Sequence, residues 1–166
     1  FTPSVPPTPL SSPVAFRQAN SFSAGIAPAG LAPGDFDHDG NTDLVVTDSA
    51  EDTLQWLRGT GTGAFRTDVG DPIPVGAEPL GVAVSDFDGD GFLDAATANA
   101  GDGTITLLFG LGDGTFDTPV TNLVASRPVA IAATGHGFAL ADALIGTVLV
   151  LQVTAERAPT VVAELA

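Results

Sequence analysis

The chain has 166 residues, enough for one domain of ordinary size. Five Arg and no Lys stand against 20 Asp and Glu, which gives a formal net charge of −15. A surface this acidic cannot neutralise phosphates, so neither nucleic acid nor an anionic membrane is an expected partner. The absence of cysteine excludes disulfide scaffolds, thiol catalysis and cysteine–zinc sites. Twenty Gly and 13 Pro among 44% hydrophobic residues favour an all-β fold of short strands and tight turns.

In chain order, residues 1–13 come first; their five prolines predict an extended segment outside the core. Phe16 and the run from Ala24 to Pro28 resemble the end of a repeat, which predicts a strand within 14–27 that belongs to a preceding unit. The chain does not begin with Met, so we expect a processed, exported protein whose signal peptide is gone, or a piece of a longer chain.

An internal duplication dominates the middle of the sequence. Residues 35–43 (DFDHDGNTD) recur as residues 86–94 (DFDGDGFLD), at an offset of 51 residues. The same offset relates Gly59 to Gly110 and Phe65 to Phe116. A third copy, residues 128–166, keeps the apolar runs 128–133 and 147–151, but its acidic loop has shrunk to residues 134–137. We therefore expect three consecutive units, at residues 28–78, 79–127 and 128–166.

Each unit contains four strand signals. In the second unit they lie at 80–85, 93–99, 104–109 and 116–124, with short continuous apolar runs that are typical of strands covered on both faces. Glycine-rich turns at 59–63 and 110–114 separate the third and fourth signals. Four strands per repeat predict β-propeller blades. Residues 128–153 are also apolar, but three glycines and Asp142 interrupt them, which argues against a transmembrane helix.

The acidic loops, the Phe109-Gly110 pair and the glycine-rich turns resemble the FG-GAP/VCBS repeats of integrin-α-type β-propellers and their bacterial and fungal lectin relatives. The resemblance implies an all-β chain of four-stranded blades. Closed propellers have 4–8 blades, and we count about three plus one extra N-terminal strand. We therefore expect an incomplete propeller, completed by oligomerisation, by further blades of a parent chain or by an open stack.

The two acidic loops predict calcium sites. Carboxylates stand at loop positions 1, 3, 5 and 9, a glycine at position 6 allows a sharp turn, and the backbone carbonyl at position 7 offers a further ligand. Oxygen ligands without His or Cys favour a hard ion, and six to eight oxygens favour Ca²⁺ over Mg²⁺. The predicted ligands are Asp35, Asp37, Asp39, Asn41 and Asp43 in the first loop, and Asp86, Asp88, Asp90, Phe92 and Asp94 in the second.

Two alternatives to a calcium site fit the sequence less well. An EF-hand requires a glutamate at position 12 and flanking helices, whereas Val46 and Thr97 stand there within strands. A solvated acidic turn without metal would not explain why the full pattern occurs twice. We expect calcium to be structural, with an affinity of about 10⁻⁴–10⁻³ M that suits the exterior of the cell. The third loop has no carboxylate and should bind nothing.

Other polar and aromatic residues have simpler interpretations. His136 is expected in an exposed turn, and Asp48, Asn99 and Asp142 are expected to begin turns at strand ends. Trp56 is expected to pack between blades rather than to form a platform for a sugar. We find no catalytic triad, no pair of catalytic glutamates and no phosphate-binding loop, so the chain is not expected to be an enzyme.

The preferred hypothesis is a non-catalytic, calcium-binding module, extracellular or on the cell surface, that binds or adheres to a protein or a glycan. A second hypothesis is a structural unit that self-associates into a ring or filament through unsatisfied sheet edges. A third is an accessory domain of a larger secreted enzyme. Fold alone does not choose between them.

Overall fold

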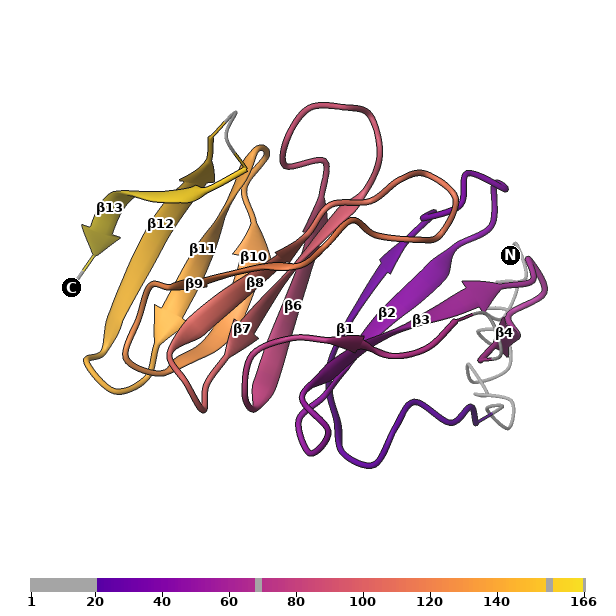
Figure 1. The fold of residues 1–166 in the computed structure, drawn as a ribbon, viewed down its shortest axis with the longest axis horizontal. Coiled ribbons are helices and arrows are strands. Elements are labelled where there is room, and N and C mark those ends of the chain that lie inside the picture. The colour runs from indigo at the N-terminus through magenta and orange to yellow at the C-terminus, as the bar shows by residue number, and fades with distance from the viewer. Residues whose placement is uncertain (1–20, 68–69, 155–156, 166) are drawn as a thin grey trace, which may run out of the picture.

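A computed structural model describes residues 21–67, 70–154 and 157–165. These residues contain strands, turns and loops but no α-helix, and the strands form three antiparallel sheets that lie side by side (Figure 1). The prediction of an all-β chain of blade-like sheets is therefore confirmed.

The first sheet follows the order β1-β2-β3-β4, and β5 also pairs with β3. Its strands are β1 (Pro28–Gly34), β2 (Asp43–Asp48), β3 (Thr53–Gly59), β4 (Phe65–Arg66) and β5 (Ile73–Pro74). The fourth position of this blade is thus divided between two short strands that pair with opposite ends of β3.

The other two sheets have four strands each. The second, in the order β6-β7-β8-β9, contains β6 (Pro79–Ser85), β7 (Asp94–Asn99), β8 (Thr104–Leu108) and β9 (Val120–Leu123). The third, in the order β10-β11-β12-β13, contains β10 (Pro128–Ala133), β11 (Gly137–Asp142), β12 (Thr147–Val153) and β13 (Pro159–Leu165).

The predicted strands of the second blade agree with the structure to within one residue, except for the fourth. A strand over 116–124 was predicted, but β9 begins only at Val120. Phe116 instead forms an isolated bridge with Gly110. Pro119 stands directly before β9, and because proline has no N–H it cannot extend the ladder toward Phe116.

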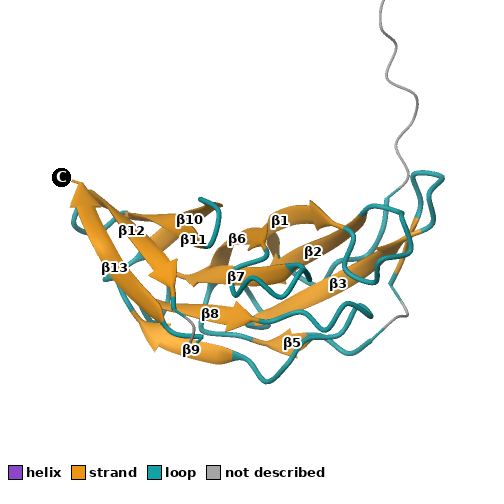
Figure 2. Ribbon diagram, turned by 90° about the horizontal axis from the view of Figure 1, so that it is seen from above, coloured by secondary structure: helices purple, strands orange, loops and turns teal. Residues whose placement is uncertain are grey.

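The three blades form an open arc. Seen from above, β1, β6 and β10 lie along one side of the arc, and β5, β8 and β9 lie along the other (Figure 2). The inner strands, β1, β6 and β10, approach one another closely at glycine residues. A Cβ on Gly30 would lie 3.0 Å from the Leu80 carbonyl oxygen, and one on Gly81 would lie 3.3 Å from the Ile131 nitrogen.

Two apolar clusters hold the blades together. Between the first and second blades, Phe36, Val45 and Leu54 pack against residues that include Leu108. Between the second and third, Phe87 meets Phe138 edge to face, with ring centroids 5.8 Å apart. Burial of these aliphatic and aromatic side chains is the main force that stacks one blade on the next.

The predicted N-terminal segments lie mostly outside the described residues. This applies to the extended segment 1–13 and to residues 14–20 of the strand predicted within 14–27. Residues 21–27 are described and form no strand. Among the described residues, no helix has the length and apolar character needed to cross a membrane.

Candidate metal centre

The first acidic loop joins β1 to β2 and brings three carboxylates together. One oxygen from each of Asp35, Asp37 and Asp39 can be chosen so that all three lie within 4.8 Å of one another. The loop is turned by its own side chains, because Asp35 accepts hydrogen bonds from the N–H groups of Asp39 (3.1 Å) and Gly40 (3.0 Å). Gly40 has φ 85°, which supplies the sharp bend expected of a glycine at position 6.

The second loop, between β6 and β7, repeats the backbone hydrogen bonds of the first loop but brings a different third carboxylate into the cluster. Asp86 accepts from the N–H groups of Asp90 (3.1 Å) and Gly91 (3.0 Å), the equivalents of the first-loop donors. Here the carboxylates of Asp86, Asp88 and Asp94 converge within 4.8 Å. In both loops the groups that converge are carboxylate oxygens, a donor set that fits a hard divalent cation.

The position-9 aspartates, Asp43 and Asp94, are buried and bind the backbone. Asp43 accepts from the N–H groups of Phe36 (3.0 Å) and Gly59 (2.7 Å), so it ties the loop to the end of β3. Asp94 makes the equivalent bonds with Phe87 (2.7 Å) and Gly110 (2.9 Å). Burial, together with the nearby charges of Asp88 and Asp90, raises the pKa of Asp94 to about 6, although the two N–H donors act to lower it.

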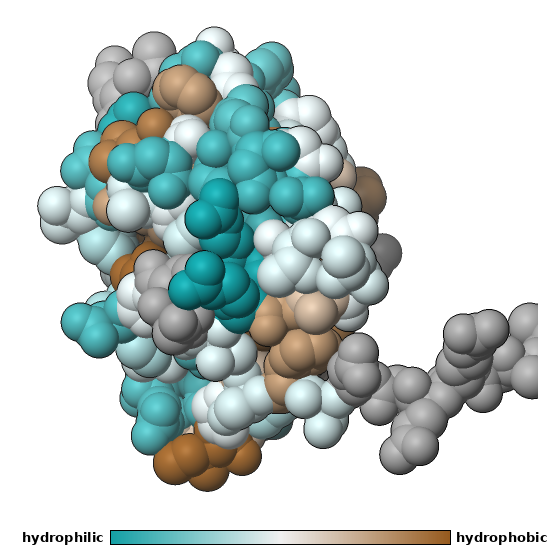
Figure 3. Space-filling model, turned by 90° about the vertical axis from the view of Figure 1, so that its right-hand side faces the viewer, coloured by the Kyte–Doolittle hydropathy of each residue, from teal (hydrophilic) through white to brown (hydrophobic). Residues whose placement is uncertain are grey.

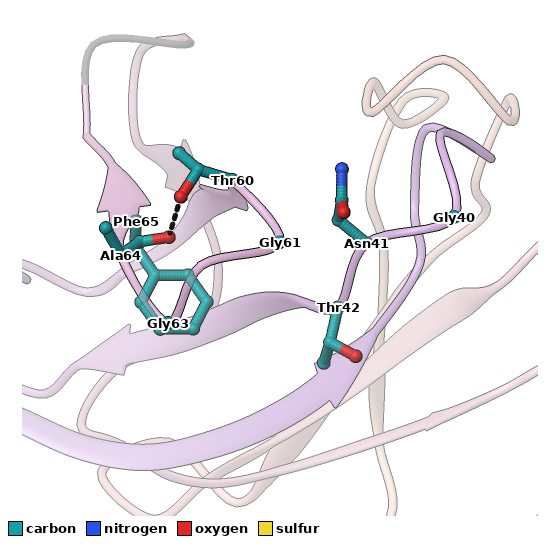
Figure 4. Close-up of a pocket in the computed structure, with 8 residues that line it drawn as sticks. All are labelled: Gly40, Asn41, Thr42, Thr60, Gly61, Gly63, Ala64 and Phe65. Atoms are coloured by element: carbon teal, nitrogen blue, oxygen red, sulfur yellow. Dashed lines mark hydrogen bonds between the residues drawn. The ribbon is translucent and has the colours of Figure 1, made fainter.

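The position-7 side chains lie close to the glycine-rich turn of their own blade. A Cβ on Gly61 would lie 2.3 Å from the Asn41 amide oxygen, and a Cβ on Gly112 would lie 2.3 Å from the Phe92 ring. Both side chains therefore lie beside the glycine-rich turn, and the Asn41 side chain also hydrogen-bonds Asp39. In the first blade, the loop and this turn enclose a pocket of about 360 Å³ (Figure 4).

Each acidic loop also contacts an arginine, which sequence reasoning missed. The Arg58 guanidinium pairs with Asp37 (2.6 Å) and Asp39 (2.9 Å). The Asn41 N–H, and less strongly Arg58, holds the pKa of Asp39 below its ordinary value. Arg157 reaches the second loop from the third blade and pairs with Asp88 at 2.9 Å. Figure 3 shows the end of the molecule formed by the first blade, where hydrophilic residues cross the middle of the surface.

The shortened third loop folds against the second acidic loop. His136 is exposed, as expected, but its Nδ1 lies 3.2 Å from the Asp86 carbonyl oxygen, and the Ser85 hydroxyl donates to the Gly135 carbonyl at 2.9 Å. Only the stacking of the blades brings these residues together, so spacing along the chain could not have indicated the contact.

Asp48 and Asp142 accept hydrogen bonds from N–H groups in the turns that follow them, as expected. Each also accepts a hydrogen bond from the segment that precedes the first strand of its blade. Asp48 accepts from the N–H groups of Ala50 in its turn (2.9 Å) and of Ile26 before β1. Asp142 accepts from Leu144 (2.9 Å) and Ser126 (2.6 Å). In the second blade, Asp102 makes the contact with the segment before the first strand.

Asn99 departs from the pattern of these aspartates. Its side-chain amide binds the hydroxyls of Thr97, Thr104 and Thr106. Asp102 accepts instead from the Ala77 N–H at 2.9 Å, although the internal repeat points to Asn99. The repeat therefore predicts that each blade has such a contact, but not which residue makes it in the second blade.

Trp56 packs against the cluster between the first and second blades, the position that was preferred for it. A Cβ on Gly114 would lie 2.1 Å from the indole ring, so the turn of the next blade can approach Trp56 this closely only with a glycine at this position.

Residues 35–97 match the family model of the FG-GAP-like repeat, which confirms the resemblance over both acidic loops. No curated protein shows significant similarity to the chain.

Solved structures match a larger part of the chain. A lead-soaked crystal of BBS1N in complex with ARL6DN aligns with TM-score 0.57 and 17% identity, over 83% of this chain and 40% of that one. A protein from Lactobacillus plantarum aligns with TM-score 0.57 and 20% identity, over 84% and 41%. The mercury-soaked BBS1N–ARL6DN crystal gives TM-score 0.58 and 16% identity, over 90% and 42%. These are β-propeller-type proteins, and the chain spans about two fifths of their length.

Proposed function

We propose that this segment, whose FG-GAP-like repeats build part of a β-propeller, binds one calcium ion in each acidic loop and serves as a non-catalytic binding or adhesion module outside the cell. The observation that supports it is the convergence of three carboxylates in each of two loops. Like charges held this close repel one another, and a divalent cation removes that cost.

Calcium has a structural role in this proposal. In each loop the ion is held by carboxylates at positions 1, 3 and 5, by the position-7 backbone carbonyl and by the buried position-9 carboxylate. Asp43 and Asp94 also bind backbone N–H groups on the neighbouring strand, so an ion on these residues stiffens the connection between the first two strands of the blade. An affinity of about 10⁻⁴–10⁻³ M would keep the sites filled outside the cell and empty in a resting cytosol.

The test is equilibrium dialysis against Ca²⁺ and Mg²⁺ at matched ionic strength, after treatment with a chelator. We expect two Ca²⁺ per chain and weaker binding of Mg²⁺. Asp37→Asn and Asp88→Asn should each remove one ion, whereas Asp71→Asn, which removes the same charge from an exposed residue outside both loops, should remove none. If the wild type binds no calcium at about 10 mM, well above the expected dissociation constant, the proposal fails.

A self-assembling structural unit is the second candidate function. It is supported by the edge of the third blade, where the last strand, β13, leaves Val161, Val162 and Leu165 48–60% exposed. An edge strand with exposed apolar side chains favours pairing with another chain.

A further inference from the structure

We propose that Arg58 and Arg157 are built-in counter-cations of the two acidic loops and that they compete with calcium for the same carboxylates. The inference rests on the proposed function, since it describes how the affinity of those sites is set and what happens to the protein when they fill.

Arg58 bridges two of the three carboxylates that converge in the first loop. Its Nε lies 2.6 Å from Asp37 Oδ2 and its Nη2 lies 2.9 Å from Asp39 Oδ2. The Asp37 side chain is only 8% exposed, whereas the Arg58 side chain is 38% exposed, so the contact lies at the boundary between protein and solvent. The guanidinium therefore supplies positive charge at the place where the loop carries its excess of negative charge.

Arg157 does the same for the second loop from a different part of the chain. It stands just before β13 in the third blade, and its Nη2 lies 2.9 Å from Asp88 Oδ2. Its Nη1 binds Asp117 at 3.0 Å, and its guanidinium carbon lies 4.5 Å from the centroid of the Phe109 ring. These three contacts cross the junction of two blades, so Arg157 also tethers the third blade to the second.

The repeat does not account for both arginines. The residue equivalent to Arg58 in the second blade is Phe109, the ring on which Arg157 stacks. Where the second blade lacks the arginine of the first, another arginine reaches the same loop from the next blade. Both pair with the carboxylate at loop position 3, Asp37 or Asp88. Because two arginines from unrelated parts of the chain pair with the same loop position, we infer that the arginine serves the loop itself.

Electrostatics gives the direction of the effect. Without an ion, the guanidinium relieves repulsion between the carboxylates, which stabilises the loop. A divalent ion bound a few ångströms from the guanidinium is repelled by it, which lowers calcium affinity by roughly threefold to tenfold in a solvated site. Because coupling between two binding events is reciprocal, calcium must weaken the arginine contacts by the same factor. At the second loop, calcium therefore loosens the tether between two blades.

The first test measures calcium affinity by dialysis for Arg58→Gln and Arg157→Gln. We expect each variant to bind one of its two ions roughly threefold to tenfold more tightly, from the loss of the repulsion. Arg127→Gln is the matched control, because Arg127 pairs only distantly with Glu78 (3.8 Å) outside both loops, and its affinity should not change.

The second test labels arginines with phenylglyoxal in the wild-type protein and maps the products by mass spectrometry. We expect calcium to raise the labelling rate of Arg58 and Arg157 severalfold and to leave that of Arg127 unchanged. This measurement needs no variant, so it still decides the matter if Arg157→Gln fails to fold.

The outcomes separate the two proposals. If the wild type binds two ions but calcium slows labelling, or if Arg58→Gln binds calcium no better than the wild type, the arginines are not competitors and only this inference is overturned. If the wild type binds no calcium at all, the proposed function fails and the competition falls with it.

Discussion

At the scale of single residues, Asp43 connects the acidic loop to its blade through hydrogen bonds to the backbone. Its two oxygens accept from the buried N–H groups of Phe36 and Gly59. Asp43→Asn would leave one of these donors facing an amide NH₂ group. We expect the variant to lose about 1–3 kcal/mol of unfolding free energy in calcium-free buffer, measured by urea denaturation. Asp71→Asn should show no such loss, and equal stability of the Asp43 variant would contradict the argument.

Asp48 gives a prediction about pH. Burial by itself would raise the pKa of Asp48, but the N–H donors of Ala50, Ile26, Ala27 and Glu51 outweigh it and the pKa lies below its ordinary value. A carboxyl group whose pKa is lowered on folding stabilises the fold above its unfolded pKa, about 3.9, and the stabilisation is lost as pH falls through the folded value.

Asp48→Asn should therefore unfold at a lower temperature than the wild type at pH 7. The difference in melting temperature should shrink as the pH is lowered below about 4, where Asp48 itself becomes protonated. Calorimetric scans of both proteins between these pH values provide the measurement. A constant difference across the range would mean that the carboxylate charge contributes nothing.

At the scale of elements, the inner strands depend on glycine for their close approach. Gly30 stands in β1 with the Leu80 carbonyl oxygen 3.0 Å and the Gly81 Cα 3.1 Å from the position of a Cβ, and backbone atoms cannot move aside cheaply. We expect Gly30→Val to cost about 1–3 kcal/mol of unfolding free energy by overpacking. Gly70→Val, where nothing lies within 4 Å of the added Cβ, is the control. Equal losses in both variants would point to β1–β6 contacts looser than the structure shows.

The strands themselves were largely predictable, because each blade repeats a short pattern of apolar runs and turn residues. The exceptions are local. β9 starts late because Pro119 interrupts the ladder, and the first blade divides its fourth strand into β4 and β5. The aspartate-rich loops could also be located from spacing alone, since all their carboxylates lie within nine residues of chain.

What spacing could not predict are contacts made by stacking. Arg157 lies 69 positions beyond Asp88 in the sequence, and His136 lies 50 beyond Asp86, yet each meets that residue in the structure. The sequence contains only a weak indication of these arginine contacts. With five cations in a chain of net charge −15, each arginine has many carboxylates with which it can pair.

At the scale of the whole molecule, the two clusters between blades show what a covered blade face looks like. On the second blade, Ala96, Ala98 and Ile105 face the third blade and are fully buried. The internal repeat assigns Ala139, Ala141 and Val148 to the same positions on the third blade. There they line an open apolar pocket of about 220 Å³, and Val148 is 38% exposed. The arc therefore ends in a face built like one that is buried elsewhere.

Charge also favours association through this end. Residues 128–166 carry three carboxylates and one arginine, so only two of the fifteen net negative charges belong to the third blade. Two copies that meet through this face would keep their acidic loops apart and bury alanine and valine side chains, which gains roughly 25 cal/mol per Å². We expect the purified chain to associate as its concentration rises, as measured by sedimentation velocity.

Val148→Asp should keep the chain monomeric, because it places a charge on the face that becomes buried. Leu111→Asp adds the same charge at a 51% exposed residue of a glycine-rich turn and should leave association unchanged. If the wild type stays monomeric at every concentration, a second copy of the chain does not cover this face of the third blade. Since the chain spans only about two fifths of the propellers it resembles, that result would favour a further blade of a longer protein on this face.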